Sequence, residues 1–488
     1  MLKIQKNLKT PFYMLLSLPA TAMGFALSVQ IAALSWIMSA KYGLEVHEVG
    51  LVWAGGPIAG ILGQVIIGVI SDKVWFWGGR RRPFMLIGGV LATLMLFALP
   101  NLDVITDKLG IEGILGVAIV TTLFLDLSIN VSFNPTRSII ADVTPDGPER
   151  TRGYTWMQTV SGTFGVMAYA IGAYFGKEFL IYFGVVLVLV CSLLPPFFIQ
   201  EPEVISLEEE ENNLKQTFSV TQIMLAIRPL WSLLAYNVYI LGDKLINGIH
   251  VSEAPNHYWP EIIFGLATVY LMADTLLKKE PVDQVDKPSL LGFKKVLAAH
   301  SFSWIGVQTM FVYMFAYLDF KFPTLSDDSV GQVIDIAFLV LSAVSALLPA
   351  ILLEPLSQKF GRVRVHTACL FVMTLGYAGI WGLADSVYAI YFFMAICGVG
   401  WAAIISLPFA IMSQRVDGTL MGTFMGLFNL AVVLPQLLSS LAIGVLISSV
   451  ADKNIIFAIA TLSLGLSTIA WTQVKPLGSS TAPSGKTQ

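Results

Sequence analysis

The sequence predicts an all-α membrane protein, and two observations lead to this fold class. Of the 488 residues, 56% are hydrophobic and 12% are charged, and the mean hydropathy is +0.74. A soluble domain carries about 25% charged residues. The chain also contains about a dozen apolar runs of the roughly 20 residues that a helix needs to cross a bilayer. The net charge of −3 is too small to indicate nucleic-acid binding.

The apolar runs divide into two sets of six, which predict two six-helix bundles. We expect an N-terminal bundle within residues 1–200, a central cytoplasmic connection at 201–297 and a C-terminal bundle within 298–474. The tail 475–488 is rich in Ser, Gly and Pro and is expected to be disordered. The expected spans are 12–40, 49–70, 84–99, 113–140, 153–175, 179–199, 298–320, 331–353, 366–384, 387–412, 419–450 and 454–471.

The first apolar run has one alternative interpretation. Lysines precede it, and Ala20-Thr21-Ala22 is similar to a signal-peptide cleavage site. The run continues to about residue 40, which is too long for a signal peptide. We therefore expect a first helix that is retained.

A short polar stretch, 71–84, separates the second and third spans and indicates the orientation of the chain. It carries Asp72 and four bases, among them Arg80, Arg81 and Arg82. Basic residues in short loops stay on the cytoplasmic side, and the expected inner loops hold about twice as many as the outer loops. We expect a multi-pass protein of the inner (plasma) membrane with both termini in the cytoplasm.

The same stretch is a candidate gate. Asp72 can pair with the three arginines in one conformation and release them in another. Asp142, at the end of the fourth span, is expected to form an ion cluster with Arg150 and Arg152 on the same side of the membrane, as a gate or a topology signal. Arg137 is either a gating residue or a structural one. The alternative for the whole stretch is a topology signal with no further role.

Two apolar segments in the central connection, 223–241 and 261–277, add a helix pair to the twelve-span plan. We expect both to cross the membrane, which returns the chain to the cytoplasm and preserves the topology. The alternative is a pair of interfacial helices that lie flat on the inner surface.

The fourth expected span is the richest in polar residues. Asp126 lies near its middle, and Asn130 and Arg137 follow four and eleven residues later, on the same helix face. Ionisable residues inside a span are costly and usually functional. Because a low dielectric disfavours a charged carboxylate, Asp126 can take up and release a proton near neutral pH, which suits a proton-coupled carrier. The alternative is a structural acid paired with an arginine of another helix.

The two halves of the chain repeat a loop pattern. Ser-Asp-Lys at 71–73 and Gly-Arg-Arg-Arg at 79–82 follow the second span, and the similar segment 357–364 follows the eighth. Major facilitator transporters are built from repeated halves related by an axis along the membrane normal, with the substrate near the midplane.

Motifs in both halves point to one branch of that superfamily. They lie at 53–60 (Trp-Ala-Gly-Gly-Pro-Ile-Ala-Gly), 71–73, 79–84 (Gly-Arg-Arg-Arg-Pro-Phe), 125–142, 407–410 (Leu-Pro-Phe-Ala) and 429–436 (Asn-Leu-Ala-Val-Val-Leu-Pro-Gln). With these motifs the chain resembles the sucrose transporter-like branch of the glycoside–pentoside–hexuronide:cation symporters, which includes plant sucrose carriers and bacterial alpha-glucoside carriers.

The resemblance implies roles for individual residues. The proton-coupling carboxylate of the family falls on Asp126, its fourth-span arginine on Arg137, and its loop Asp and Arg on Asp72 and Arg81. Two features depart from the family. The seventh span lacks the acids of plant members, and the extra helix pair is not part of the plain family plan.

Other polar side chains in the spans are candidate sugar ligands, since each can hydrogen-bond a sugar hydroxyl. Each can equally tie two helices together. These residues are Gln30, Asn130, Gln158, Gln308, Asn429 and Gln436. The sequence carries no nucleotide-binding loop, metal-ligand spacing or nucleophile constellation. We therefore expect no enzyme, no catalytic residue, no cofactor and no metal.

The sequence as a whole predicts a secondary active transporter that couples the symport of a sugar and a proton by alternating access. The expected substrate is an alpha-linked disaccharide such as sucrose or maltose. The alternatives are a sodium-coupled glycoside symporter and a sugar sensor that does not transport. The expected partners are the sugar, a proton or sodium ion and the lipid bilayer, with no nucleic acid, and the chain is expected to act as a monomer.

Overall fold

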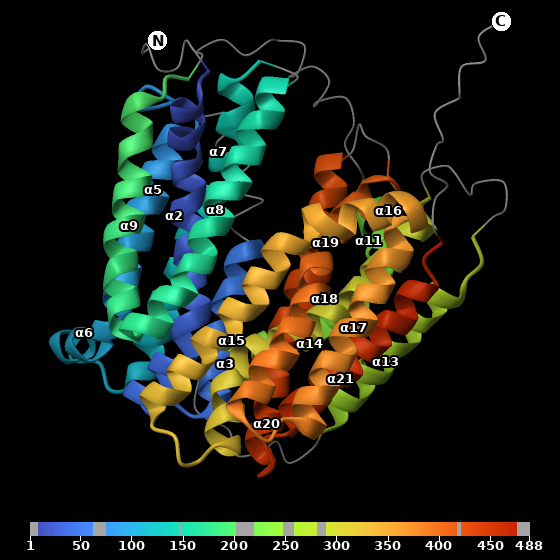
Figure 1. The fold of residues 1–488 in the computed structure, drawn as a ribbon. Helices are drawn as coiled ribbons and strands as arrows, with labels where there is room; N and C mark the ends of the chain where they lie inside the picture. Colours follow the sequence, from blue (N-terminus) through green and yellow to red (C-terminus); the bar gives the residue numbers. More distant parts are fainter. Residues whose placement is uncertain are drawn as a thin grey trace, which may run out of the picture. The chain divides into compact units, whose positions relative to one another are not determined.

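The computed structural model describes residues 8–61, 75–145, 148–201, 219–246, 258–280, 289–416 and 421–475. These residues are mostly helical, and the β-structure found among them is an isolated bridge between Phe76 and Gly79. Ten helices in the described part are long and apolar enough to cross a membrane. The all-α membrane fold class that the sequence predicts is therefore confirmed (Figure 1).

In the first half of the chain, glycine and proline residues mark where several helices begin. Gly113 and Gly176, both at φ +86°, turn the chain into the two helices that follow them. Proline near the first turn opens two other helices, where its missing N–H costs nothing. The helices are α2 (Thr10–Trp36), α3 (Val46–Trp53), α5 (Arg82–Ala98), α6 (Leu102–Leu109), α7 (Ile114–Val143), α8 (Pro148–Phe175) and α9 (Lys177–Phe198).

The second half contains the central helices and the remaining spans. Its helices are α11 (Val220–Ala226), α12 (Trp231–Ile246), α13 (Trp259–Leu277), α14 (Leu290–Lys321), α15 (Asp327–Leu348), α16 (Glu354–Phe360), α17 (Arg362–Leu383), α18 (Val387–Ser413), α19 (Met421–Leu438), α20 (Gly444–Ser449) and α21 (Ile455–Thr472). The π-helical segments η1 (Ile37–Lys41), η5 (Pro349–Leu353) and η7 (Ser439–Ile443) continue α2, α15 and α19, and the 3₁₀ segments are η2 (Leu99–Asn101) and η3 (Arg228–Leu230).

The observed helices match the expected spans closely. Nine expected spans coincide with helices that are long and apolar enough to cross a membrane, and α8 and α14 occupy the fifth and seventh expected spans. Residues 62–70 of the second expected span, and the tail after residue 475, lie outside the described residues. The division into an N-terminal bundle, a central connection and a C-terminal bundle stays a prediction.

Contacts divide the chain into two compact units, and unit 1 contains segments of both halves of the sequence. Unit 1 comprises Met1–Lys215, Gln308–Leu339 and Gln436–Ile456, and unit 2 comprises Gln216–Val307, Val340–Pro435 and Phe457–Gln488. In unit 1, α2 packs against α8 and α9, and α5 packs against α7 and α9 (Figure 1). The ends of these helices enclose a core that includes Phe12, Leu16, Met85, Ile139, Ile140 and Met157.

A π-helical segment of unit 1, η7, contacts both α3 and α14. A π turn breaks the regular i→i−4 pattern and so changes which carbonyls find partners within the helix. Tyr313 of α14 donates its hydroxyl proton to the Ser439 carbonyl in η7, over 2.9 Å. Gly50 of α3 lies against the same segment, and a Cβ at this position would approach the Ser440 carbonyl oxygen to 2.2 Å. A small residue at position 50 is therefore required for α3 and η7 to meet.

Unit 2 is built around aromatic and histidine side chains. In it α17 packs along α18. His300 of α14 stacks on Phe428 of α19, with ring centroids 5.0 Å apart, and accepts a hydrogen bond from Trp304. His366 of α17 packs against Trp471 of α21 at 4.3 Å. These aromatic contacts join four helices of the unit.

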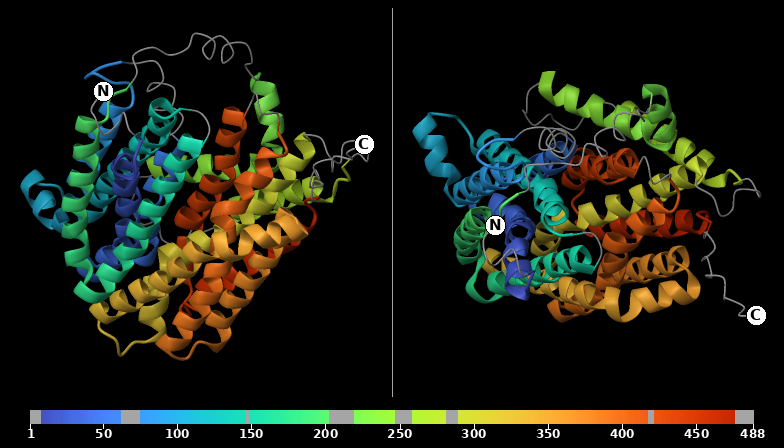
Figure 2. Two further views of the ribbon diagram at one scale, coloured as in Figure 1. Left: turned by 45° about the horizontal axis from the view of Figure 1, so that its top comes forward. Right: turned by 90° about the horizontal axis from the view of Figure 1, so that it is seen from above.

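The central segments form a helix pair in unit 2 (Figure 2). A hydrogen bond joins α12 of this pair to α19. Ser232 of α12 donates to the Phe264 carbonyl of α13, and Asn237 donates to the Leu434 carbonyl of α19. One face of α13 exposes large apolar side chains, including Ile263, Leu266 and Tyr270, which suits contact with lipid. Of the two, α13 is long and apolar enough to span. That both helices cross the membrane stays a prediction.

A buried ion cluster holds the end of this helix pair against the rest of unit 2. Arg415, which follows α18, donates to Glu280 over 3.3 Å and to the Lys475 carbonyl. Lys295 of α14 lies 3.9 Å from the same carboxylate. Burial lowers the pKa of the Arg415 guanidinium, and the Glu280 carboxylate opposes that shift. A Cβ at Gly292 would approach the Arg415 guanidinium to 2.5 Å, so the glycine makes room for it.

We expect Arg415→Met to destabilise the protein by about 3–5 kcal/mol, because it leaves the Glu280 carboxylate buried without its arginine. The measurement is the thermal unfolding midpoint of the detergent-purified protein. Adding Glu280→Gln to Arg415→Met should recover part of the loss. The matched control is Arg362→Met at the exposed start of α17. Equal unfolding midpoints for Arg415→Met and Arg362→Met would contradict the role given to this cluster.

Candidate functional site

Asp126 lies in the middle of α7 and is almost completely buried, with 5% of its surface exposed. The side-chain amide of Gln30, on α2, donates to Asp126 Oδ2 over 2.9 Å. Gly56 faces the same carboxylate, and a Cβ there would lie 3.4 Å from Oδ2. Gly55 lies against the backbone of Leu123. These two glycines, which belong to the second expected span, allow the chain to approach α7 closely beside Asp126.

The partner of Asp126 is neutral, whereas Glu280 and Asp335, the other buried acids in the described part of the chain, each lie beside a basic side chain. Among the described residues, no Lys or Arg forms an ion pair with it. The Oε1 atom of Gln30 is also buried and has no hydrogen-bond partner in the described part of the chain. The Asp126–Gln30 pair can therefore exchange a proton or accept a hydroxyl donor without breaking an ion pair.

The other candidate sugar ligands have different surroundings. Gln436 donates to Gln308 over 3.1 Å, and both belong to unit 1. Asn130 donates to the main-chain carbonyl of Asp126, one turn earlier in α7. Gln158 is exposed on α8, and Asn429 is half-buried in unit 2. The structure thus brings Gln30 to Asp126 and Gln308 to Gln436, and the role of each as a sugar ligand stays a prediction.

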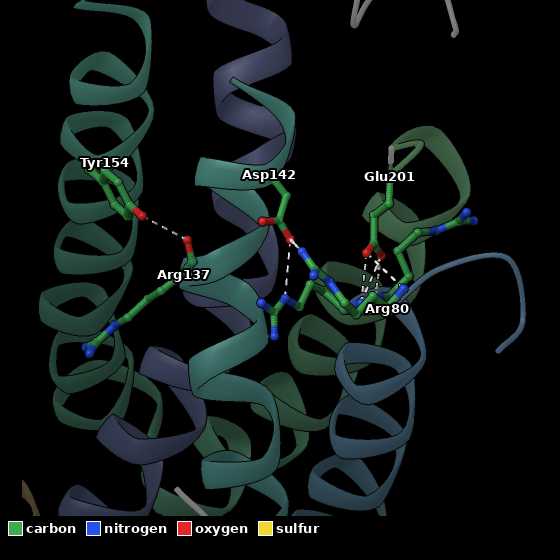
Figure 3. A network of polar contacts seen from close by, with 7 residues as sticks. Arg80, Arg137, Asp142, Tyr154 and Glu201 are labelled. Carbon is green, nitrogen blue, oxygen red and sulfur yellow. Dashed lines mark hydrogen bonds and ion pairs between the residues drawn. The ribbon is translucent and has the colours of Figure 1, made fainter. Parts of the chain in front are cut away.

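The arginines before α5 form an ion cluster with the end of α7 (Figure 3). Arg80 Nη2 lies 3.0 Å from Asp142 Oδ2, and Arg81 Nε donates to the same oxygen over 3.3 Å. Arg81 is buried, whereas Asp142 is partly exposed. The sequence predicts Arg150 and Arg152 as the partners of Asp142, whereas the structure pairs this carboxylate with Arg80 and Arg81. Arg152 donates instead to the Thr10 hydroxyl over 3.1 Å.

Glu201 completes this cluster, and the sequence reasoning missed it. Its carboxylate accepts hydrogen bonds from the main-chain N–H groups of Arg80, Arg81 and Arg82, at 2.9, 2.9 and 2.7 Å (Figure 3). A carboxylate at this place is favourable because the first N–H groups of a helix have no partner within it and carry its positive dipole end. Glu201 is an acid directly after the sixth expected span, and this position is the sequence feature that could have identified it. The acidic run after it suggested a solvated stretch instead.

Two candidate gating residues take no part in the contacts of this cluster that the structure describes. The Arg137 side chain points away from Asp142 (Figure 3). Its guanidinium lies 5.2 Å from the centroid of the Phe133 ring. Its main-chain carbonyl accepts the hydroxyl of Tyr154 over 3.3 Å. Asp72 lies outside the described residues.

A second buried carboxylate, Asp335 on α15, was also missed. Lys177 Nζ lies 2.6 Å from Asp335 Oδ1, and the two side chains are 3% and 0% exposed. The signal was present in the sequence, because Asp335 is an acid inside an expected span, as Asp126 is. The position of Lys177 at the start of the sixth span suggested an outer-loop residue and not a buried partner.

The comparisons with known proteins place this architecture in a family. The sequence profile of the Major Facilitator Superfamily matches residues 16–440. The chain belongs to the Major Facilitator Superfamily. Its curated relatives include the sucrose transport protein SUC4 of Arabidopsis thaliana, 23% identical over 457 residues, which are 87% of this chain and 82% of that protein. The general alpha-glucoside permease of Schizosaccharomyces pombe is 32% identical over 136 residues, which are 27% and 24% of the two chains.

Solved structures of this superfamily share the fold. The inward-open xylose transporter XylE from E. coli matches with a TM-score of 0.60 at 11% identity, over 95% of this chain and 96% of that one. The major facilitator fold and the resemblance to the sucrose transporter-like branch are confirmed. This major facilitator protein is a multi-pass membrane transport protein and not an enzyme.

We expect Glu201→Ala to loosen the start of α5 in this major facilitator protein, by about 2 kcal/mol, since three N–H groups lose a charged acceptor. Trypsin should then cut after Arg80 and Arg81 roughly 30-fold faster, because cleavage needs local opening of the chain. The rate is measured on the detergent-purified protein by mass spectrometry. Glu178→Ala, an exposed acid at the start of α9, is the control. Equal cleavage rates for the two variants would contradict the capping role of Glu201.

Proposed function

We propose that this protein is a secondary active transporter that moves a sugar together with a proton by alternating access, and that the sugar is an alpha-linked disaccharide such as sucrose or maltose. Two relatives support the substrate class, since one is named a sucrose transport protein and the other an alpha-glucoside permease. Membership in the Major Facilitator Superfamily supports transport by alternating access.

One observation carries the assignment of proton coupling. Asp126 is a carboxylate buried inside a span, and its side-chain partner is the neutral amide of Gln30. A buried charge without a counter-ion is costly, so such a carboxylate favours binding a proton. Asp335 differs, because Lys177 already neutralises it. Of these two buried carboxylates, Asp126 is the one that can change its charge without leaving a cation unpaired.

Gln30 offers a physical link between the proton and the sugar. Its NH₂ group donates to the ionised form of Asp126, and its unpartnered Oε1 can accept a hydrogen bond from a sugar hydroxyl. A protonated Asp126 can itself donate to a sugar hydroxyl or to Gln30 after rotation of the amide. Sugar and proton binding are then coupled, and the coupling is reciprocal.

The remaining assignments belong to the same proposal. Arg80, Arg81 and Asp142 form a cytoplasmic gate together with Asp72, and Arg137 contributes to gating near the inner surface. Both termini lie in the cytoplasm, and residues 1–200 and 298–474 act as the two bundles that move. The pairing of Arg80 and Arg81 with Asp142 supports a cluster that can hold in one state and open in another.

The first experiment is uptake of a panel of labelled disaccharides by cells that express the protein, with and without a protonophore. We expect one alpha-linked disaccharide to accumulate, and the protonophore to abolish its accumulation. Asp126→Asn should lose accumulation but keep exchange of sugar across the membrane, because the neutral amide mimics a carboxyl group that stays protonated. Asp103→Asn, at an exposed acid of α6, is the matched control and should accumulate sugar as the wild type does.

Other outcomes point to the alternatives. Accumulation that resists the protonophore but requires sodium indicates a sodium-coupled glycoside symporter. Sugar binding without uptake indicates a sensor. Accumulation by Asp126→Asn that is still driven by the proton gradient would remove Asp126 from the coupling role.

The Gln308–Gln436 pair allows a separate test of sugar contact. If these amides bind sugar hydroxyls, Gln436→Leu leaves a buried partner unsatisfied and should raise KM roughly tenfold, with little change in maximal rate. KM is measured from initial uptake rates over a range of sugar concentrations. Gln358→Leu on exposed α16 is the control. A KM for Gln436→Leu within the error of the control value would assign the pair to helix packing.

A further inference from the structure

Unit 1 contains a buried ion pair, Lys177–Asp335, that has no role in sugar or proton binding in the proposed transport cycle. Lys177, the first residue of α9, lies 2.6 Å from Asp335 Oδ1 of α15. The same ammonium group donates to the Ala32 carbonyl of α2, also over 2.6 Å. A single cation thus connects three helices, two from the first half of the sequence and one from the second.

Glycines create the space for this pair. A Cβ at Gly172 of α8 would lie 2.4 Å from Asp335 Oδ2, and a Cβ at Gly331 of α15 would lie 3.0 Å from the ring of Trp36 and 3.1 Å from Lys177 Cε. Neither contact leaves room for a larger residue. The helices therefore approach one another closely around the ion pair.

Further hydrogen bonds join the same two sets of helices. Trp36 of α2 donates to the Asp327 carbonyl over 3.0 Å, and Gln332 of α15 donates to the Ala173 carbonyl of α8 over 2.9 Å. Ser35 donates to the Val312 carbonyl of α14 over 2.7 Å. All of these contacts lie within unit 1. They form a closed junction between first-half and second-half helices, at the end that the loop charges predict to face the outside.

The Lys177–Asp335 pair has an oxygen without a hydrogen-bond partner, which a permanent structural ion pair would be expected to satisfy. Asp335 Oδ2 is buried and has no hydrogen-bond partner among the described residues. A buried ion pair repays the loss of hydration only when its remaining atoms are also satisfied. A cavity of about 540 Å³ borders Lys177, and its lining includes Trp36, Asp328 and Gln332, so water can reach the pair once the helices separate.

We propose that Lys177 and Asp335 form the outer gate of this transporter, an ion pair that is closed in this structure and separates when the outer side opens. The inference rests on the proposed alternating access, since that cycle requires first-half and second-half helices to part at their outer ends. In the closed state each charge neutralises the other away from water. In the open state each is hydrated separately.

Single and double substitutions at this gate should have opposite effects on the opening of the outer end. Asp335→Asn or Lys177→Met leaves one charge buried and unpaired in the closed state, which should drive the outer end open. The double variant Lys177→Met with Asp335→Leu places two apolar side chains in the junction. Opening would expose them to water, so the double variant should return to the closed state.

The experiment measures the distance between spin labels at Tyr174→Cys and Asp328→Cys, two exposed positions next to the pair, by pulsed electron resonance in lipid nanodiscs without sugar. The three native cysteines, which are buried and free, are replaced first. We expect the ratio of long to short distances to rise at least about tenfold in either single variant, because the unpaired buried charge costs more than a tenfold change requires. The double variant should restore the wild-type distribution. Glu178→Gln, which loses a more exposed contact with Lys41, is the control.

Single variants that lower thermal stability but keep the wild-type distances would overturn the gate and leave a structural ion pair. Two single variants are used so that one can fold where the other does not. The readout needs no sugar, so it fails separately from the proposed function. A shift in distance without uptake of any disaccharide keeps the gate and rejects the substrate, whereas proton-driven uptake with unchanged distances keeps the symport and rejects the gate.

Discussion

The cost of keeping a charge away from water determines where this protein holds its ionisable side chains and what they can do. Lys177 and Asp335 are buried together, and Arg415 is buried against Glu280. Arg80 and Arg81 share the carboxylate of Asp142. Asp126 is different, because its partner is the neutral Gln30. A paired charge can hold helices together, whereas a carboxylate with a neutral partner can bind and release a proton.

This distinction assigns different tasks to different ends of the same helices. The middle of α7 carries Asp126, and its end carries Asp142, so one helix connects the proposed coupling site to the proposed inner gate. In α2, Gln30 lies only two residues before Ala32 and six before Trp36, which are beside the proposed outer gate. Movement of either helix changes a gate and the surroundings of Asp126 together. A rigid helix is therefore a sufficient physical link between proton binding and access.

Hydrophobic length was enough to predict most of the helices, because crossing a bilayer requires a run of apolar residues whatever the run packs against. The same rule found Asp126, since an acid in such a run is conspicuous. The side chains that contact these buried charged residues were harder to predict. Gln30 and Asp126 are 96 residues apart, and Lys177 and Asp335 are 158 residues apart, and no local pattern records which helices meet. Glu201 was missed because its function is to accept main-chain N–H groups, which have no side-chain signature at the arginines.

The most direct test of the central claim is the proton movement that sugar itself causes in proteoliposomes containing the purified protein. Sugar is added outside without an imposed gradient, and the external pH is followed in lightly buffered solution. We predict an alkalinisation for the wild type that a protonophore abolishes, and none for Asp126→Asn, which still exchanges sugar. A wild-type sugar flux without proton movement, or an equal alkalinisation by Asp126→Asn, would contradict the account.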